Sequence, residues 1–273
     1  MIGYIIWDVS PEIFTIGSFS LRWYGLLFAA TFFFGYLILK RFIKMDGLSI
    51  KVLDSLAMYF FIGTVIGARL GHCFFYEADY YLSNPAEILK IWHGGLSSHG
   101  GAVGILMALY LFSRKFKIPM INILDRVVVV VALGGLLIRM GNLFNSEIYG
   151  IETTLPWGFI FVRAGETVPK HPTQIYEGLA ALLIFFLLYK LFVSKHKQLH
   201  NGVLFGLFLT LLFTMRFFVE FIKEDQVAHE AGMVLNIGQW LSLPFILFGI
   251  GLLIYIYYKN KGFLIKNDSP KKS

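Results

Sequence analysis

Seven long apolar runs constrain the fold of this chain more than any other feature of its sequence. They cover approximately residues 21–40, 54–76, 95–112, 124–141, 174–193, 202–222 and 237–258. A transmembrane α-helix needs about 20 predominantly apolar residues, and each run is close to that length. The composition agrees, since 57% of the residues are apolar, only 15% are charged and the mean hydropathy is +0.68. The sequence therefore predicts an integral membrane protein.

The runs fit helices better than the strands of a membrane barrel. Barrel strands alternate apolar and polar residues over about 10 positions, whereas these runs are continuously apolar and longer. We predict an all-α polytopic protein of about seven transmembrane helices, built as a single helical domain over residues 1–260. Its outer loops are expected at 77–94, 142–173 and 223–236, and a basic cytoplasmic tail at 261–273. The glycines Gly63, Gly67 and Gly71 form a small-residue ridge that is typical of close helix packing.

Basic residues predict the orientation of the chain, because cytoplasmic loops of membrane proteins carry the excess of Lys and Arg. They gather in alternate connections and in the tail: Lys40, Arg41, Lys44 and Lys51; Arg114, Lys115, Lys117 and Arg126; Lys190, Lys195 and Lys197; Lys259, Lys261, Lys266, Lys271 and Lys272. The N-terminus lacks the pattern of a cleaved signal peptide. We therefore predict an outer N-terminus and a cytoplasmic C-terminus. The net charge of +7 reflects this bias and does not indicate nucleic-acid binding.

Polar residues gather at the ends of the runs that are predicted to lie in the outer leaflet. They are Arg22, Tyr24, Arg69, His72, Ser97, Ser98, His99, Arg139, Asn142, His171, Gln174, Glu177, Arg216, Glu220, Asn236 and Gln239. A charged side chain at the bilayer centre costs about 2.5–3.5 kcal/mol on insertion scales, so such residues usually face protein, water or a bound ion. The pattern predicts one polar cavity that opens toward the outer leaflet. Its arginines favour a phosphate or carboxylate group, and at this depth a phospholipid head is the natural ligand.

Two of these groups have alternative interpretations. Arg216 can pair internally with Glu220, and Arg139 with Glu147, in which case the arginines are structural. His99 lies between glycine pairs, where its imidazole can face a cavity and exchange protons near neutral pH. A hydrogen-bonded core histidine is the alternative for that position.

Several motifs resemble those of the bacterial prolipoprotein diacylglyceryl transferases, and the likeness extends from about residue 12 to 260. The segment "IRMGNLFNSEIYG" matches the family signature at six fixed positions: Arg139, Gly141, Asn142, Asn145, Glu147 and Gly150. "RWYG", "SSHGG", "HPTQIYE" and "RFFVEF" occur in the family's order with similar spacing. The chain departs from the family pattern at Ile138, Leu143, His72 and Leu212, the last of which replaces a tyrosine near Arg216.

The resemblance implies that the diacylglyceryl group of phosphatidylglycerol passes to the thiol of the lipobox cysteine in a prolipoprotein signal peptide, with release of glycerol phosphate. A thiol must lose its proton before it attacks carbon, and the leaving phosphate gains charge that fixed cations can stabilise. By this likeness Arg139 and Arg216 hold the phosphate and His99 is the general base; if the thiolate forms by other means, His99 only positions a substrate. Asn142 and Tyr24 are expected to donate hydrogen bonds to the lipid head, and Glu147 to orient an arginine or the loop. The full set predicted to bind substrate is Tyr24, Asn142, Glu147, Gly150, Glu220, Arg69 and Gln239. The implied location is the bacterial inner membrane, with the active site toward the outer leaflet.

No metal or cofactor is expected, since neither H-E-x-x-H nor G-x-x-x-x-G-K-[ST] occurs. The outer-side histidines His72, His93, His99 and His171 lack the spacing of paired ligands on one helix. A retinal receptor would need a lysine within 237–258, which contains none. An intramembrane serine protease is only weakly suggested by Ser97 and Ser98 beside His99. The main alternative is a protein that binds or transports anionic lipids, although we identify no internal repeat, and the polar residues grouped above lie toward the outer ends of their runs.

Overall fold

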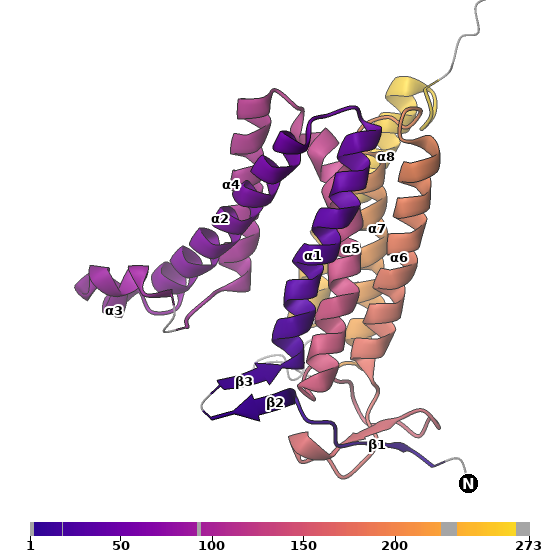
Figure 1. The fold of residues 1–273 in the computed structure, drawn as a ribbon. Coiled ribbons are helices and arrows are strands. Elements are labelled where there is room, and N and C mark those ends of the chain that lie inside the picture. The colour runs from indigo at the N-terminus through magenta and orange to yellow at the C-terminus, as the bar shows by residue number, and fades with distance from the viewer. Residues whose placement is uncertain (1–2, 18, 92–93, 225–233, 266–273) are drawn as a thin grey trace, which may run out of the picture. The chain divides into compact units, whose positions relative to one another are not determined.

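The computed structural model describes residues 3–17, 19–91, 94–224 and 234–265. Seven long helices dominate it (Figure 1): α1 (Trp23–Met45), α2 (Ile50–Phe75), α4 (Ser98–Phe116), α5 (Met120–Phe144), α6 (Thr173–Lys195), α7 (Val203–Val219) and α8 (Ile237–Asn260). Among the described residues, six helices are long and apolar enough to cross a membrane, and α4 is the long helix outside this set. The prediction of a helical, multi-pass membrane protein is therefore confirmed. Of the predicted outer loops, residues 92–93 and 225–233 lie outside the described residues, as do tail residues 266–273.

The chain divides into two compact units. Unit 1 comprises Met1–Ile38 and Leu124–Ser273, and unit 2 comprises Leu39–Ile123. Unit 1 contains most of α1 and α5 together with α6, α7 and α8. Unit 2 contains α2, α4 and two short helices between them, α3 (Ala78–Ser83) and η1 (Pro85–Leu89).

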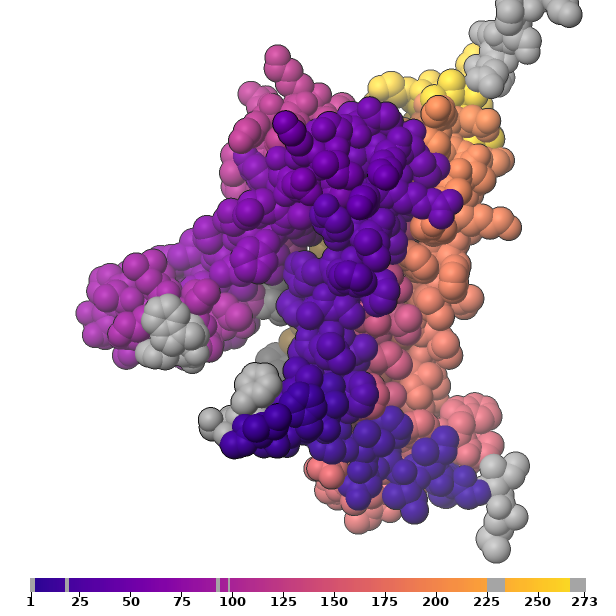
Figure 2. Space-filling model, in the orientation of Figure 1, coloured from indigo at the N-terminus to yellow at the C-terminus, as the bar shows by residue number. Residues whose placement is uncertain are grey.

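Small residues let the helices of unit 1 approach closely. A Cβ atom added to Gly134 of α5 would lie 2.8 Å from Cγ2 of Thr31 in α1, and one on Gly249 of α8 would lie 2.6 Å from Oγ1 of Thr210 in α7. Such contacts are typical of membrane helices, whose association depends on close packing because lipid is as apolar as the side chains. The helix α1, drawn in indigo and purple in the space-filling view (Figure 2), has four exposed phenylalanines, as expected for a surface solvated by lipid: Phe28, Phe32, Phe33 and Phe34.

The same packing device joins α2 to α4 in unit 2. A Cβ atom on Gly71 would lie 2.6 Å from the Cα of Gly100, and one on Gly67 would lie 2.6 Å from the Cα of Gly104. The predicted role of Gly63, Gly67 and Gly71 in helix packing is confirmed. Ser97 begins α4 as its N-cap, because its Oγ accepts a hydrogen bond from the Gly100 amide at 3.3 Å.

In the part of the chain that the structure describes, four short strands lie outside the helices, and they were not predicted. β1 (Ile5–Trp7) pairs in parallel with β4 (Phe159–Phe161), and β2 (Glu12–Ile16) pairs antiparallel with β3 (Phe19–Arg22). With three to five residues each, they are too short for an alternating pattern to be recognised in the sequence. The strand β4 contributes Phe159 and Phe161 to a small core that also contains Leu143. Trp7 of β1 packs against this core.

A buried carboxylate fastens the other end of unit 1. Asp125 of α5 accepts a hydrogen bond from the Gly202 amide at 2.6 Å and another from the Phe205 amide at 2.8 Å. These amides belong to the N-cap residue and the first turn of α7, where backbone donors have no partner within the helix. Asp125 therefore caps a helix that lies 77 residues further along the chain.

Candidate active site

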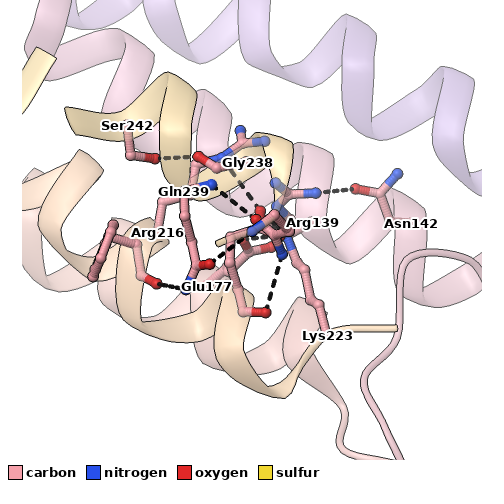
Figure 3. A network of polar contacts seen from close by, with 11 residues as sticks. Arg139, Asn142, Glu177, Arg216, Lys223, Gly238, Gln239 and Ser242 are labelled. Carbon is pink, nitrogen blue, oxygen red and sulfur yellow. Dashed lines mark hydrogen bonds and ion pairs between the residues drawn. The ribbon is translucent and has the colours of Figure 1, made fainter. Parts of the chain in front are cut away.

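Five charged side chains form a continuous series at the end of unit 1 that carries β4 (Figure 3). Arg139 of α5 places Nε 2.7 Å from Oε2 of Glu177 in α6. Oε1 of Glu177 lies 2.9 Å from Nζ of Lys223, which in turn lies 3.0 Å from Oε1 of Glu220. Glu220, in the short helix η4 (Glu220–Ile222), pairs with Nε of Arg216 at 3.4 Å. We call this series the charge chain; cations and carboxylates alternate along it.

Exposure differs sharply along the charge chain. The side chains of Glu177 and Lys223 are each 3% exposed, whereas those of Arg139 and Arg216 are 20% and 40% exposed. Buried ions are costly to desolvate unless they are paired. The middle of the chain is therefore neutralised internally, and the accessible positive charge lies at its two arginine ends.

Asn142 connects Arg139 to Glu147 without letting their charges pair directly. Its Oδ1 accepts from Nη1 of Arg139 at 3.2 Å, and its Nδ2 donates to Oε1 of Glu147 at 2.8 Å. Asn145 donates to the same carboxylate oxygen at 3.3 Å. Of the two internal pairs considered from the sequence, the one between Arg216 and Glu220 is present, but Arg139 pairs with Glu177 instead of Glu147.

The loop after α5 has a strained backbone. Ser146 and Ile148 adopt φ values of 53° and 60°, in the left-handed region that residues other than glycine rarely occupy. Gln174 of α6 holds the loop by donating to the carbonyl oxygen of Glu147 at 2.7 Å. Its own Oε1 is buried, and no described residue donates to it. Strain of this kind persists where the surrounding structure fixes a site.

Three glycines permit close approaches around the charge chain. A Cβ atom on Gly141 would lie 2.7 Å from the Tyr24 ring, and one on Gly238 would lie 2.5 Å from the carboxyl carbon of Glu220. A Cβ atom on Gly150 would lie 2.8 Å from Cβ of His171. Gly150 therefore contributes room for the backbone, and Gly141 brings Tyr24 next to the α5 signature residues.

The start of α8 supports Glu220. Asn236 caps the helix through a reciprocal pair of hydrogen bonds with Gln239, and its Nδ2 donates to Oε2 of Glu220 at 3.2 Å. The carboxylate of Glu220 thus lies against a helix N-terminus, where negative charge is stabilised. Gln239, predicted to contact a substrate, uses its side chain for this cap and for the carbonyl oxygen of Phe217 at 3.4 Å.

Unit 1 contains eight of the ten predicted site residues: Tyr24, Arg139, Asn142, Glu147, Gly150, Arg216, Glu220 and Gln239. The other two, Arg69 and His99, belong to unit 2. Arg69 is buried and donates hydrogen bonds to the carbonyl oxygens of Glu87, Ile88, Lys90, Gly94 and Gly95. Its guanidinium therefore holds the segment that precedes α4. His99 is the second residue of α4 and is exposed.

A second ion cluster lies in the loops beside the site. Lys170 pairs with Glu224 and, at 3.4 Å, with Glu166, which also accepts from the Tyr149 hydroxyl at 2.7 Å. Burial raises the pKa of the Tyr149 phenol, and the hydrogen bond to Glu166 raises it further. Burial opposes the charge of Lys170, yet the two carboxylates outweigh it and raise the pKa of the ammonium.

Sequence reasoning missed two central members of the charge chain. Glu177 was included among the polar residues but received no role, and Lys223 was not singled out at all. A signal for Lys223 existed: it is a lysine on the side predicted to be depleted in positive charge, three residues after Glu220. A cation that departs from the charge bias and follows a carboxylate at this spacing indicates a paired, functional position.

Comparison with known proteins agrees with the motifs. A family model described as "Prolipoprotein diacylglyceryl transferase" matches residues 11–255. A relative from Tolumonas auensis, named phosphatidylglycerol–prolipoprotein diacylglyceryl transferase, is 46% identical over 252 residues, which are 92% of this chain and 96% of the relative. Relatives of the same name from Chloroherpeton thalassium and Bacteroides fragilis are 46% and 41% identical and cover 93% and 94% of this chain, and 94% and 96% of their own lengths.

The residues matched by the family model include helices of both units. They also include all five residues of the charge chain. The resemblance noted in the signature motif is thereby confirmed over nearly the whole sequence. The chain belongs to the prolipoprotein diacylglyceryl transferase family.

Proposed function

We propose that this protein transfers the diacylglyceryl group of phosphatidylglycerol to the lipobox cysteine of prolipoproteins. The cysteine thiolate attacks the diacylglyceryl carbon that bears the phosphate. A sulfur–carbon bond forms, the carbon–oxygen bond breaks, and its electron pair leaves with glycerol phosphate. Family membership and the names of the relatives support this reaction.

The charge chain is the observation that carries the proposal. Its accessible ends are two arginines, whose planar guanidinium groups suit the oxygens of a phosphodiester. Negative charge grows on the phosphate as the carbon–oxygen bond breaks. Fixed cations that need no rearrangement stabilise such a transition state more than the ground state.

The neighbouring residues have roles that follow from their contacts. Asn142 orients Arg139, and Tyr24, packed on Gly141, is placed to donate its hydroxyl to the lipid head. Glu147 acts through Asn142 and not on the lipid. His99 is the candidate acceptor of the thiol proton by its place in the family motif "SSHGG", and its side chain is exposed. Arg69 has a positioning role toward the residues before α4.

The pairing of the strands supports a topology with seven crossings. β1 and β4 are hydrogen-bonded to each other, so residues 5–7 and 159–161 lie on one side of the membrane. An even number of crossings must separate them. The helices between them are α1, α2, α4 and α5, and we propose that all four cross, which gives an even number although α4 is outside the six spans counted by hydropathy. With the basic connections on the cytoplasmic side, the N-terminus and the charge chain belong to the outer leaflet of the inner membrane.

The test uses purified protein in detergent and phosphatidylglycerol labelled in its diacylglyceryl part. Two lipobox peptides are compared, one with its cysteine and one with serine in that position. We expect label on the cysteine peptide alone, together with released glycerol phosphate. If folded protein binds the lipid but transfers no label, the lipid-binding or transport function replaces the transferase.

A further inference from the structure

We infer that Lys223 is a positioning residue that keeps Arg139 and Arg216 available to a phosphate group. The inference deepens the proposed function and rests on it. Lys223 is the central cation of the charge chain, and it reaches both carboxylates: Nζ lies 2.9 Å from Glu177 and 3.0 Å from Glu220. Each carboxylate in turn contacts one of the arginines.

The backbone at Lys223 is fixed by the signature loop. Gly150 forms an antiparallel bridge with Lys223, and the Ile151 amide donates to the carbonyl oxygen of Ile222 at 3.0 Å. Because a side chain on Gly150 would meet this strand segment, only glycine lets the loop reach it. The family glycine at position 150 therefore acts on the site by holding Lys223 in place.

Burial separates the role of Lys223 from that of the arginines. Its side chain is 3% exposed, so its ammonium serves the two carboxylates and does not meet a ligand that arrives from outside. The arginines are several times more exposed. Lys223 must therefore influence a bound phosphate through Glu177 and Glu220.

The charge balance explains that influence. Three cations share two carboxylates along the charge chain, which leaves one positive charge in excess. Without the ammonium the series would be neutral, and each buried carboxylate would have one arginine as its cationic partner in the series. The arginines would then turn their remaining N–H groups inward to satisfy the carboxylates. A phosphate would have to compete with carboxylates for the same donors.

The test compares Lys223→Met with the double variant Lys223→Met/Glu220→Gln, in which the excess charge of the series is restored. We expect the single change to raise the KM for phosphatidylglycerol about tenfold or more, the effect of losing one charge-assisted contact. The double variant should regain part of this loss. Lys223→Arg should stay closer to the unchanged protein, because a guanidinium can also reach two carboxylates.

Lys170→Met provides the matched control. Lys170 is likewise buried between two carboxylates in the neighbouring loops, but it lies outside the charge chain. We expect this change to lower the melting temperature and to leave the KM for phosphatidylglycerol unchanged. If Lys223→Met and Lys170→Met affect KM alike, or if the Glu220→Gln change gives no recovery, Lys223 is only structural and the inference is wrong.

Binding of glycerol phosphate, measured by calorimetry, separates this inference from the proposed reaction. It reports the availability of the arginines whether or not transfer takes place. Weaker binding by Lys223→Met, with recovery in the double variant, supports the inference even if no labelled peptide forms. Equal binding by the unchanged protein and Lys223→Met overturns it even if the protein is an active transferase.

Discussion

The Nε atom of Arg139 lies 2.7 Å from Oε2 of Glu177, in an ion pair that joins α5 to α6. The contact engages only one edge of the guanidinium. Nη1 is directed to Asn142, and no described residue accepts a hydrogen bond from Nη2. Arg139 is thus held in orientation while part of its donor fork stays available, which is what recognition of a phosphate requires.

Replacing Arg139 tests whether this fork is essential. Arg139→Ala should abolish turnover, and Arg139→Lys should restore little, because an ammonium cannot hold Glu177, Asn142 and a phosphate in the same plane. The label-transfer assay measures both variants, with membrane insertion and melting temperature as controls. Normal turnover by a well-folded Arg139→Ala protein would remove Arg139 from the site.

Asn142→Asp keeps the shape of the side chain but places a carboxylate between Arg139 and Glu147. The new charge would pair with Arg139, and Glu147 would lose the donor that now lies 2.8 Å away. We expect activity to fall about 100-fold, because the new carboxylate would compete with the phosphate for Arg139, the preorganised donor.

The double variant Asn142→Asp/Glu147→Gln tests this explanation of the loss. A glutamine at position 147 could donate to the new carboxylate, so activity should recover partly. Equal losses in the single and double variants would show that the Asn142–Glu147 contact has no part in orienting Arg139.

The glycine contact between α2 and α4 should be sensitive to a single methyl group. Gly67→Ala places a Cβ atom 2.6 Å from the Cα of Gly104, so the helices must separate, at a cost of about 1–3 kcal/mol. Gly101→Ala on α4 is the matched control, since its Cβ atom would be 3.6 Å from its nearest neighbour. Thermal unfolding in detergent should show a lower melting temperature for Gly67→Ala only.

Alkaline pH should weaken the loop cluster around Tyr149. The usual pKa of a tyrosine is 10.0, and burial together with Glu166 raises the pKa of the folded phenol above it. Above about pH 10 the unfolded chain releases this proton while the folded chain retains it, so the free energy of unfolding falls as pH rises. Lys170, whose pKa is also raised, contributes in the same direction.

Tyr149→Phe isolates the contribution of this phenol. The variant should be less stable at pH 8, because the hydrogen bond to Glu166 is lost. Its melting temperature should then decline less steeply above pH 10.0 than that of the unchanged protein. Parallel curves would mean that Tyr149 does not titrate differently in the folded state.

The buried cap on α7 predicts a loss of stability without a loss of chemistry. Asp125→Ala leaves the Gly202 and Phe205 amides without their acceptor, which should cost about 0.5–2 kcal/mol. Activity per folded molecule should be retained, since Asp125 has no contact with the charge chain. Asp79→Ala, an exposed position in α3, should change the melting temperature little. Lost turnover in folded Asp125→Ala protein would contradict this assignment.

The sequence was sufficient for the elements whose physics is local. Apolar length predicted the helices, and the spacing of Arg139 with Asn142 and of Arg216 with Glu220 predicted contacts that the structure contains. It could not reveal the partnership of Glu177 with Lys223, which joins residues 46 positions apart through the fold. The strands of three residues and the burial of Arg69 among carbonyl oxygens likewise depend on tertiary contacts.

The cap on α7 also has a consequence for the biosynthesis of this protein. Asp125 is synthesised 77 residues before Gly202, so the first half of unit 1 must wait for amides that the ribosome has yet to produce. A nascent chain interrupted after α6 carries a carboxylate whose two partners never arrive. Both bonds can form only after residue 205 has been made, so the ends of α5 and α7 that meet at Asp125 are joined late in synthesis.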